Sequence, residues 1–133
     1  LQAGWADVNR QGGVLLLAQM SSRGNLLDSQ YTSQVVEKGK THGGVFGFIG
    51  NGSRPNELRE LRKAVGEAKM IWTPGVNLAV GDGEMGQRYG DPAQAVNAGS
   101  DCIIVGSGIH MADNPSQQAA KYAEVSWHAL LNR

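Results

Sequence analysis

The stretch Asp101-Cys102-Ile103-Ile104-Val105-Gly106-Ser107-Gly108 places an apolar run directly before a serine that is flanked by two glycines. A nearly continuous apolar run is typical of a strand that is covered on both faces, as strands in parallel sheets are. The glycines allow a tight turn whose successive backbone N–H groups can point at an anion. A plain strand-ending turn would use the same glycines, so the stretch predicts a buried strand followed by either an anion-binding turn or a simple turn.

The same order of strand and helix is expected four times along the chain. The expected strands are 13–18, 44–49, 70–72 and 101–105. Each is followed by a helix that starts at a capping side chain or a first-turn proline. These helix starts are Asp28 or Ser29, Pro55, Asp91-Pro92 and Asn114-Pro115, and residues 1–10 are expected to end an earlier helix. Alternating strands and helices predict an α/β fold with a parallel sheet and helical crossovers.

Glycines and apolar spacing define the helix ends and faces. The first helix is expected to stop near Gly39 and the third at Gly99, because glycine is favoured just past a helix end. In the second helix Leu58, Leu61 and Val65 share one face. The last helix is expected to pack through an apolar stripe consisting of Ala119, Ala120, Ala123, Trp127, Leu130 and Leu131.

Two architectures fit this pattern, namely an open doubly wound sheet and part of a TIM (β/α)8 barrel. A dinucleotide-binding sheet needs Gly-x-Gly-x-x-Gly after its first strand, and residues 19–24 lack it. The glycines instead follow the last two strands, at Thr73-Pro74-Gly75-Val76 and at Gly106-Ser107-Gly108. Phosphate sites in barrels are commonly built from the loops after strands seven and eight. Residues 1–133 are therefore predicted to be about half of a barrel, with its strands five to eight.

Composition excludes several classes of protein. The 133 residues include 12 basic and 12 acidic side chains and 41% hydrophobic residues, which fits neither a disordered chain nor a membrane protein. A balanced charge gives no reason to expect nucleic acid or a membrane surface as a partner. The lone Cys102 allows no internal disulfide and is expected to be a buried small side chain, so a cytoplasmic location is expected. The first residue is Leu1 and not an initiator Met, so these 133 residues are expected to be a portion of a longer chain.

Five segments, in order along the chain, resemble the orotidine 5′-phosphate decarboxylase family. Ala18-Gln19-Met20-Ser21-Ser22-Arg23-Gly24-Asn25-Leu26 is similar to the family's Ala-Glu-Met-Ser-Ser-x-Gly-Ser-Leu at strand five. Residues 101–108 are similar to Asp-Ile-Ile-Ile-Val-Gly-Arg-Gly at strand eight. The other three are Gly47-Phe48-Ile49 with Gly52-Ser53-Arg54, Thr73-Pro74-Gly75-Val76, and Gly86-Gln87-Arg88-Tyr89, where the family usually has Gly-Gln-Gln-Tyr. The resemblance implies an intact barrel that converts orotidine 5′-phosphate to UMP in pyrimidine biosynthesis, without a cofactor or a metal.

The resemblance also implies which residues bind the nucleotide monophosphate. Ser22 would contact the pyrimidine ring, although a serine at this place could simply cap a turn. Gln87 and Tyr89 would reach the phosphate from a long loop, although a solvated loop without contacts is the alternative. The implied substrate-binding set is completed by Pro74, Gly106, Ser107 and Gly108.

Besides Arg88, the sequence departs from the family in three respects. Ser107 stands where the family has an arginine, whose charged guanidinium group can form two hydrogen bonds to a phosphate. Gln19 stands where the family has a glutamate. The catalytic Asp-x-Lys-x-x-Asp array of the family occurs nowhere in the 133 residues, so no catalytic residue is expected in this chain. His42, His110 and His128 have no mutual spacing typical of metal ligands.

Three functions follow as hypotheses. In the first, the intact protein is a homodimeric decarboxylase to which this chain contributes ring and phosphate contacts. In the second, the chain is an inactive half barrel that is completed by its missing N-terminal half or by a second copy, because four strands cannot close a barrel. In the third, the protein is a phosphosugar decarboxylase or synthase of the same superfamily. Gln87 and Tyr89 argue against this hypothesis, but only because they resemble residues of the orotidine 5′-phosphate decarboxylase family.

Overall fold

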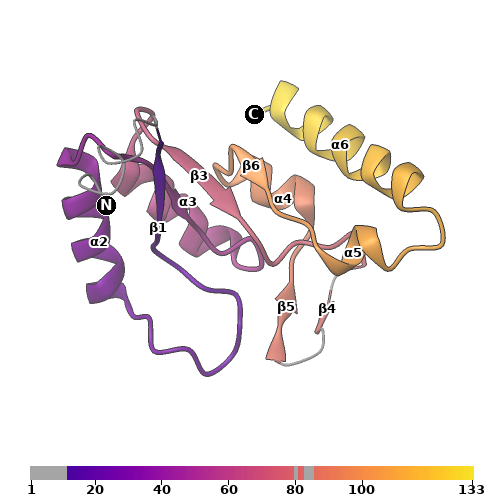
Figure 1. The fold of residues 1–133 in the computed structure, drawn as a ribbon, viewed down its shortest axis with the longest axis horizontal. Helices are drawn as coiled ribbons and strands as arrows, with labels where there is room; N and C mark the ends of the chain where they lie inside the picture. The colour runs from indigo at the N-terminus through magenta and orange to yellow at the C-terminus, as the bar shows by residue number, and fades with distance from the viewer. Residues whose placement is uncertain (1–11, 80, 83–85) are drawn as a thin grey trace.

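The computed structural model describes residues 12–79, 81, 82 and 86–133, and its centre is a four-stranded parallel sheet (Figure 1). The strands lie in the order β1-β2-β3-β6, which confirms the four predicted strand–helix units. Their bounds are β1 Val14–Leu17, β2 Val45–Ile49, β3 Met70–Thr73 and β6 Cys102–Ile103. The helix end expected in residues 1–10 lies outside the described residues.

Local capping sets the helix starts that the sequence predicts. The Asp28 carboxylate accepts from Tyr31 N at 2.7 Å, Asp91 accepts from Gln94 N at 2.9 Å, and Asn114 accepts from Gln117 N at 3.0 Å. Pro55 occupies the first turn of its helix. The helices are α2 Ser29–Thr41, α3 Pro55–Val65, α4 Pro92–Asn97, α5 Ser107–His110 and α6 Pro115–Leu131. No helix among the described residues is long and apolar enough to cross a membrane.

Two expected features differ in detail. Helix α2 ends at Thr41, just past the Gly39 near which it was expected to stop, and Gly39 serves packing, since a Cβ there would lie 2.6 Å from the Phe48 ring. The long loop expected from Thr73 to Gly90 contains a two-stranded antiparallel hairpin of β4 (Gly81–Asp82) and β5 (Arg88–Tyr89).

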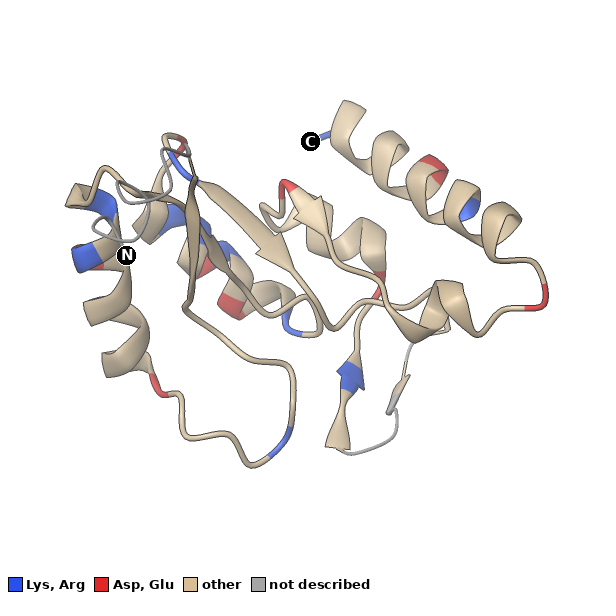
Figure 2. Ribbon diagram, viewed as in Figure 1, with Lys and Arg blue, Asp and Glu red and all other residues tan. Residues whose placement is uncertain are grey.

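The core fills the space between one face of the sheet and the helices. Neighbouring helices contact one another in the order α2-α3-α4-α6, and α3 and α4 lie behind the sheet in the view of Figure 1. Phe48 and Ile71 are opposite each other in β2 and β3 and are fully buried, in one core cluster with the predicted apolar face of α3. The four strands of the parallel sheet carry no Lys, Arg, Asp or Glu, and the charged side chains lie on helices, loops and the β4–β5 hairpin (Figure 2). Burial of apolar side chains on this face is the main favourable contribution to the free energy of folding.

The opposite face of the sheet is not covered by any described element. In β3 the exposed Met70 alternates with the buried Ile71, as expected when one face is covered and the other is open. A bulge in β2, between the pairs Val14–Val45 and Leu15–Gly47, turns Phe46 to the open face. There its ring packs edge-on against Trp72, with centroids 5.9 Å apart. The large apolar residues exposed on this face are Leu17, Phe46, Met70 and Ile104.

The predicted apolar stripe of α6 was wrong. Tyr122 and Ala129 are buried instead, whereas Trp127 and Leu131 are 60% and 63% exposed. The hydroxyl of Tyr122 donates to Asn77 Oδ1 at 3.0 Å and accepts from Leu78 N at 3.1 Å. These polar contacts at the end of a buried ring fix the rotation of α6, and apolar spacing along the helix does not report them.

Asp101 connects three elements of the fold. Its carboxylate accepts from Ile71 N at 2.8 Å and forms an ion pair with Arg62 of α3, and Arg133 lies 3.7 Å from its other oxygen. The Arg62 guanidinium also donates to the carbonyls of Gly66 and Gly99. The Arg62 and Asp101 side chains are only 12% and 25% exposed, so this ion pair is less screened by water than surface pairs are.

We expect Asp101→Asn to lower the free energy of unfolding by about 1–3 kcal/mol, because Arg62 loses its charged partner inside the fold. Urea denaturation followed by circular dichroism measures the change. Glu60→Gln is the matched control, since Glu60 and Lys63 are 72% and 71% exposed and their pair should contribute less than about 1 kcal/mol. Equal losses in the two variants would contradict the role assigned to Asp101.

Candidate ligand-binding site

The carboxyl ends of β1, β2 and β3 lie at one edge of the sheet, and backbone hydrogen bonds join the loops that follow them. Gly52 N donates to Pro74 O at 3.0 Å, and Gly90 N donates to Gly75 O at 2.8 Å. Arg23 N donates to Gly86 O at 3.0 Å, which ties the loop after β1 to the hairpin. Strand ends of a parallel sheet are where ligands bind in α/β folds, so this joined set of loops is the candidate site.

Gln87 connects the hairpin to the loop after β1. Its Nε2 donates to Ser21 Oγ, and the Ser21 residue is only 6% exposed. Gly75 makes this approach possible, because a Cβ at that position would lie 2.6 Å from Ser21 Cβ. Gly75 also has φ +77°, which disfavours any side chain there. The Ser21–Gln87 pair is therefore held by backbone geometry on both sides.

Tyr89 connects the hairpin to the loop after β6. Its hydroxyl lies 3.4 Å from Ser107 Oγ, a separation at the outer limit of a hydrogen bond. Gly106 caps the short helix α5, which begins at Ser107. Gly108 faces the Tyr122 hydroxyl so closely that a side chain there would collide with it. Gln87, Tyr89, Gly106, Ser107 and Gly108 thus lie in two loops that meet through one side-chain contact.

The structure places Ser22 and Pro74 differently from the other predicted site residues. Ser22 borders a cavity on the helix side of its loop, and its carbonyl accepts from Asn25 Nδ2 at 2.6 Å. Pro74 is half-buried, and its carbonyl accepts from Gly52 N. Ser22 and Pro74 as ligand contacts stay predictions. Ser21, which sequence reasoning missed, is the serine that contacts Gln87.

Asn51 and Gln19 hold the loop after β1 and were also missed as site-building residues. Gln19 Oε1 accepts from Asn51 N at 3.0 Å, and its Nε2 donates to Glu57 O at 3.0 Å. Asn51 Nδ2 donates to Met20 O at 3.1 Å, and its Oδ1 accepts from the Ser53 hydroxyl at 2.7 Å. A glutamate at position 19 could not donate to the Glu57 carbonyl, so the amide of Gln19 joins this loop to α3 in a way that a carboxylate cannot.

Cys102 lies in β6, opposite Trp72, and is only half-buried. Burial, with a smaller contribution from the negative charge of Asp101, raises the pKa of the Cys102 thiol. A raised pKa keeps the sulfur protonated near neutral pH, which is the opposite of what a nucleophile needs. Among the described residues no group of His, Cys, Asp and Glu could hold a metal ion.

Comparison with known proteins identifies the family. The model of the "Orotidine 5′-phosphate decarboxylase / HUMPS family" matches residues 1–122. The chain belongs to this family. It is 38% identical over 128 residues to the orotidine 5′-phosphate decarboxylase of Emericella nidulans, covering 96% of this chain and 46% of that protein. It is also 38% identical over 122 residues to that of Coccidioides immitis, covering 91% and 44%.

A solved structure within the family gives the architecture. The crystal structure of orotidine 5′-phosphate decarboxylase from Pyrococcus horikoshii superposes with a TM-score of 0.70 and 29% identity, covering 92% of this chain and 54% of the other. The chain thus spans about half the length of the relatives that it matches. Its four strand–helix units form about half of a (β/α)8 barrel, as the sequence predicts.

We expect the Cys102 thiol of the folded protein to react with a disulfide reagent more slowly at pH 7–8 than the same thiol in denaturant. The raised pKa leaves less thiolate at a given pH, so the rate should rise at higher pH in the folded state than in the unfolded state. Stopped-flow absorbance against pH, with Cys102→Ser as the blank, measures both profiles. A folded-state profile displaced to lower pH would contradict the assignment of Cys102 as a structural residue.

Proposed function

We propose that the intact protein is an orotidine 5′-phosphate decarboxylase, to which this chain contributes loops that bind the pyrimidine ring and the phosphate. The observation that carries the proposal is the junction of three strand-end loops through Ser21–Gln87 and Tyr89–Ser107. These side chains offer an amide donor and three hydroxyls at the place where barrel ligands bind. The family membership and the named relatives support the same activity.

The two contacts divide the binding work in this proposal. Gln87 can donate one amide hydrogen to Ser21 and still has a second for a phosphate oxygen. Tyr89 and Ser107 are 3.4 Å apart, so both hydroxyls can turn toward an oxyanion placed between the hairpin and α5. Ser21 and Pro74 lie at the ends of β1 and β3, beside the ring in this arrangement.

The chemical step requires residues from outside these 133. In the decarboxylation the bond between C6 and the carboxylate breaks, CO2 leaves, and the electron pair that stays on C6 takes up a proton to give UMP. The sequence contains no Asp-x-Lys-x-x-Asp from which a lysine could supply that proton beside paired carboxylates. This chain therefore binds and orients the nucleotide, and the other half of the barrel performs the proton transfer.

A second candidate function is a half-barrel subunit that assembles without catalysing. Association with another half barrel is favoured by the apolar face carrying Leu17, Phe46 and Met70, and by the outer edges of β1 and β6, with which no described strand pairs. Ser107 also favours it, since a hydroxyl replaces the charged grip on phosphate that the family's arginine implies. The two candidates differ in turnover, because only the first produces UMP.

We expect Ser107→Arg to tighten UMP binding to the intact protein on the order of tenfold to a hundredfold, the value of a charge-assisted hydrogen bond. Isothermal titration calorimetry measures the affinity. Ser116→Arg is the matched control, because it adds the same charge at an exposed position of α6, away from these loops. Conversion of orotidine 5′-phosphate to UMP is then assayed in both. Absence of turnover even with arginine at position 107 would exclude the decarboxylase and favour the second candidate, a half-barrel subunit without catalytic activity.

We expect Ser21→Ala to weaken UMP binding roughly threefold to tenfold, because Gln87 loses the acceptor that orients its amide. Ser22→Ala is the comparison variant, because it removes the neighbouring hydroxyl in the same loop. If the ring contact predicted for Ser22 exists, its loss weakens binding by a similar factor; if Ser22 only borders the outer cavity, the affinity stays unchanged. Calorimetry on both variants measures this, and an unchanged affinity in Ser21→Ala would contradict the role of the Ser21–Gln87 pair.

A further inference from the structure

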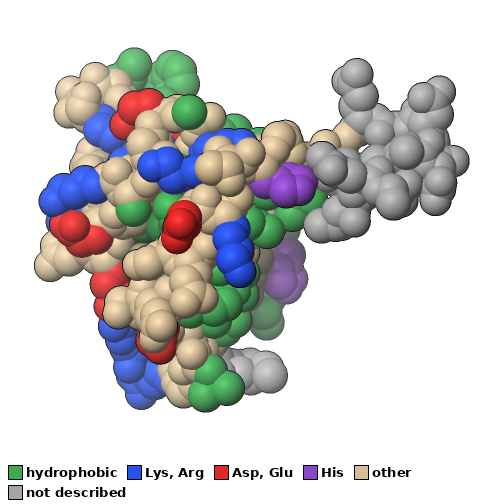
Figure 3. Space-filling model, turned by 90° about the vertical axis from the view of Figure 1, so that its left-hand side faces the viewer, with side chains coloured by type: hydrophobic (Ala, Val, Ile, Leu, Met, Phe, Trp, Pro, Cys, Tyr) green, Lys and Arg blue, Asp and Glu red, His purple; other side chains and the backbone are tan. Residues whose placement is uncertain are grey.

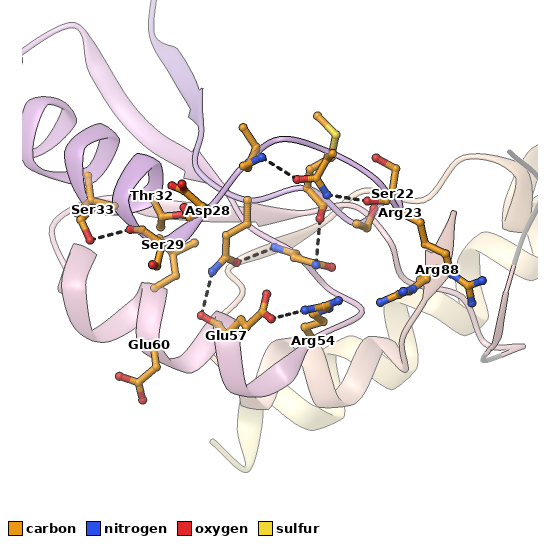
Figure 4. A pocket seen from close by; sticks show the side chains of 18 of the residues that line it. Ser22, Arg23, Asp28, Ser29, Thr32, Ser33, Arg54, Glu57, Glu60 and Arg88 are labelled. Atoms are coloured by element: carbon orange, nitrogen blue, oxygen red, sulfur yellow. Dashed lines mark hydrogen bonds and ion pairs between the residues drawn. The ribbon is translucent and has the colours of Figure 1, made fainter. Parts of the chain in front are cut away.

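A cavity of about 630 Å³ lies on the helix side of the strand-end loops, bordered by α2, α3 and the loop after β1 (Figure 4). Its volume is in the range of small-molecule sites. Ser21 and Ser22 border it, but Gln87, Tyr89 and Ser107 do not. The cavity is therefore a separate space from the proposed nucleotide site, and the two share one wall, the loop after β1.

The two ends of this cavity differ in chemistry. Arg23, Arg54 and Arg88 lie together at one end, although they come from three different segments of the chain (Figure 4). Hydroxyl groups line the other end, where α2 begins, and apolar side chains line the wall between α2 and α3. The hydroxyl residues are Ser29, Thr32 and Ser33, and the apolar residues are Leu27, Val36 and Leu61.

Arg88 is the cation at this end whose charge is not compensated by the fold. Arg54 forms an ion pair with Glu57, and Arg23 is engaged in an interaction of its own. Among the described residues the Arg88 side chain has no hydrogen-bond or ion-pair partner, and its Nε is buried from solvent. A buried donor without an acceptor costs roughly 1–3 kcal/mol of desolvation. Asp28, Glu57 and Glu60 also line the cavity, but the only ion pair between its described lining residues joins Glu57 to Arg54, so an anion beside Arg88 would compensate a charge that the described residues leave unpaired.

The hairpin aims Arg88 at this cavity. Side chains of successive strand residues point to opposite sides, and Arg88 and Tyr89 are consecutive in β5. Tyr89 points to Ser107, so Arg88 points away from the proposed nucleotide site and borders the cavity. The face of the molecule that contains α2 has interspersed basic and acidic side chains (Figure 3). A general positive surface therefore does not explain the arginines, whereas a specific anion does.

We propose that this cavity is a second ligand site, which binds a small hydroxylated phosphate monoester. Its phosphate lies against Arg88 and Arg54, whose guanidinium groups match phosphate oxygens, and its hydroxylated carbon chain extends toward Ser29 and Thr32. The ligand is held without any covalent step. The site goes beyond the proposed decarboxylase function and does not depend on it. Gln87, Tyr89 and Ser107, which would bind the phosphate of UMP, take no part in binding the second ligand.

The test uses ribose 5-phosphate as the probe and the intact protein saturated with UMP, so that the nucleotide site is occupied. We expect calorimetry to show saturable binding of ribose 5-phosphate that Arg88→Gln weakens about tenfold or more. Arg59→Gln is the matched control, because Arg59 lies on the exposed side of α3, where it donates to Asn56, and does not border the cavity. The UMP affinity should be the same in all three proteins, which separates this site from the proposed function.

Several outcomes would overturn the second site. These are an equal probe affinity in Arg88→Gln and Arg59→Gln, complete displacement of the probe by UMP, and no saturable binding at all. Inorganic phosphate serves as a second probe, and binding as tight as that of ribose 5-phosphate would reject the hydroxylated ligand. If Arg88→Gln does not fold, Arg54→Gln replaces it, since the Arg54 side chain is 48% exposed and its loss leaves the core intact.

Discussion

Parallel pairing of β1, β2, β3 and β6 is the constraint from which the rest of the structure follows. Parallel strands need crossover connections, so each strand is followed by a helix that returns along the same face of the sheet. All four carboxyl ends therefore lie at one edge, and their loops meet there. Gly75, with its positive φ and its close approach to Ser21, shows how tightly two of these loops are packed.

The β4–β5 hairpin adds a second level of organisation at this edge. Its three consecutive residues Gln87, Arg88 and Tyr89 alternate in direction, so the first and third face the neighbouring strand-end loops and the second faces the helices. One short segment thereby contributes to two chemically different spaces. A change in the hairpin's register by one residue would exchange these directions, which gives the Arg23–Gly86 backbone hydrogen bond a role in fixing that register.

How much the sequence predicts depends on the range of the interaction that decides each feature. Helix starts at Asp28, Asp91 and Asn114 were predicted because capping joins residues only a few positions apart. The buried face of α6 was not predicted, because it is decided by the contact between Tyr122 and Asn77, which are 45 positions apart. Likewise, nothing in the pair Ser21-Ser22 indicates which hydroxyl faces Gln87, which is 66 positions from Ser21. The order of the motifs indicates which loops form the candidate site, but long-range contacts decide which side chains meet there.

The open face of the sheet links stability to binding. Its apolar residues Leu17, Phe46 and Ile104 are each more than a third exposed, and no strand in the described part of the chain pairs with the outer edges of β1 and β6. Another half barrel would bury these side chains, pair both edges and bring further strand-end loops opposite Gln87 and Tyr89. The surface that completes the core is therefore continuous with the one that encloses a ligand. Because ligand and partner would both favour the closed ring, binding of either should increase the affinity for the other.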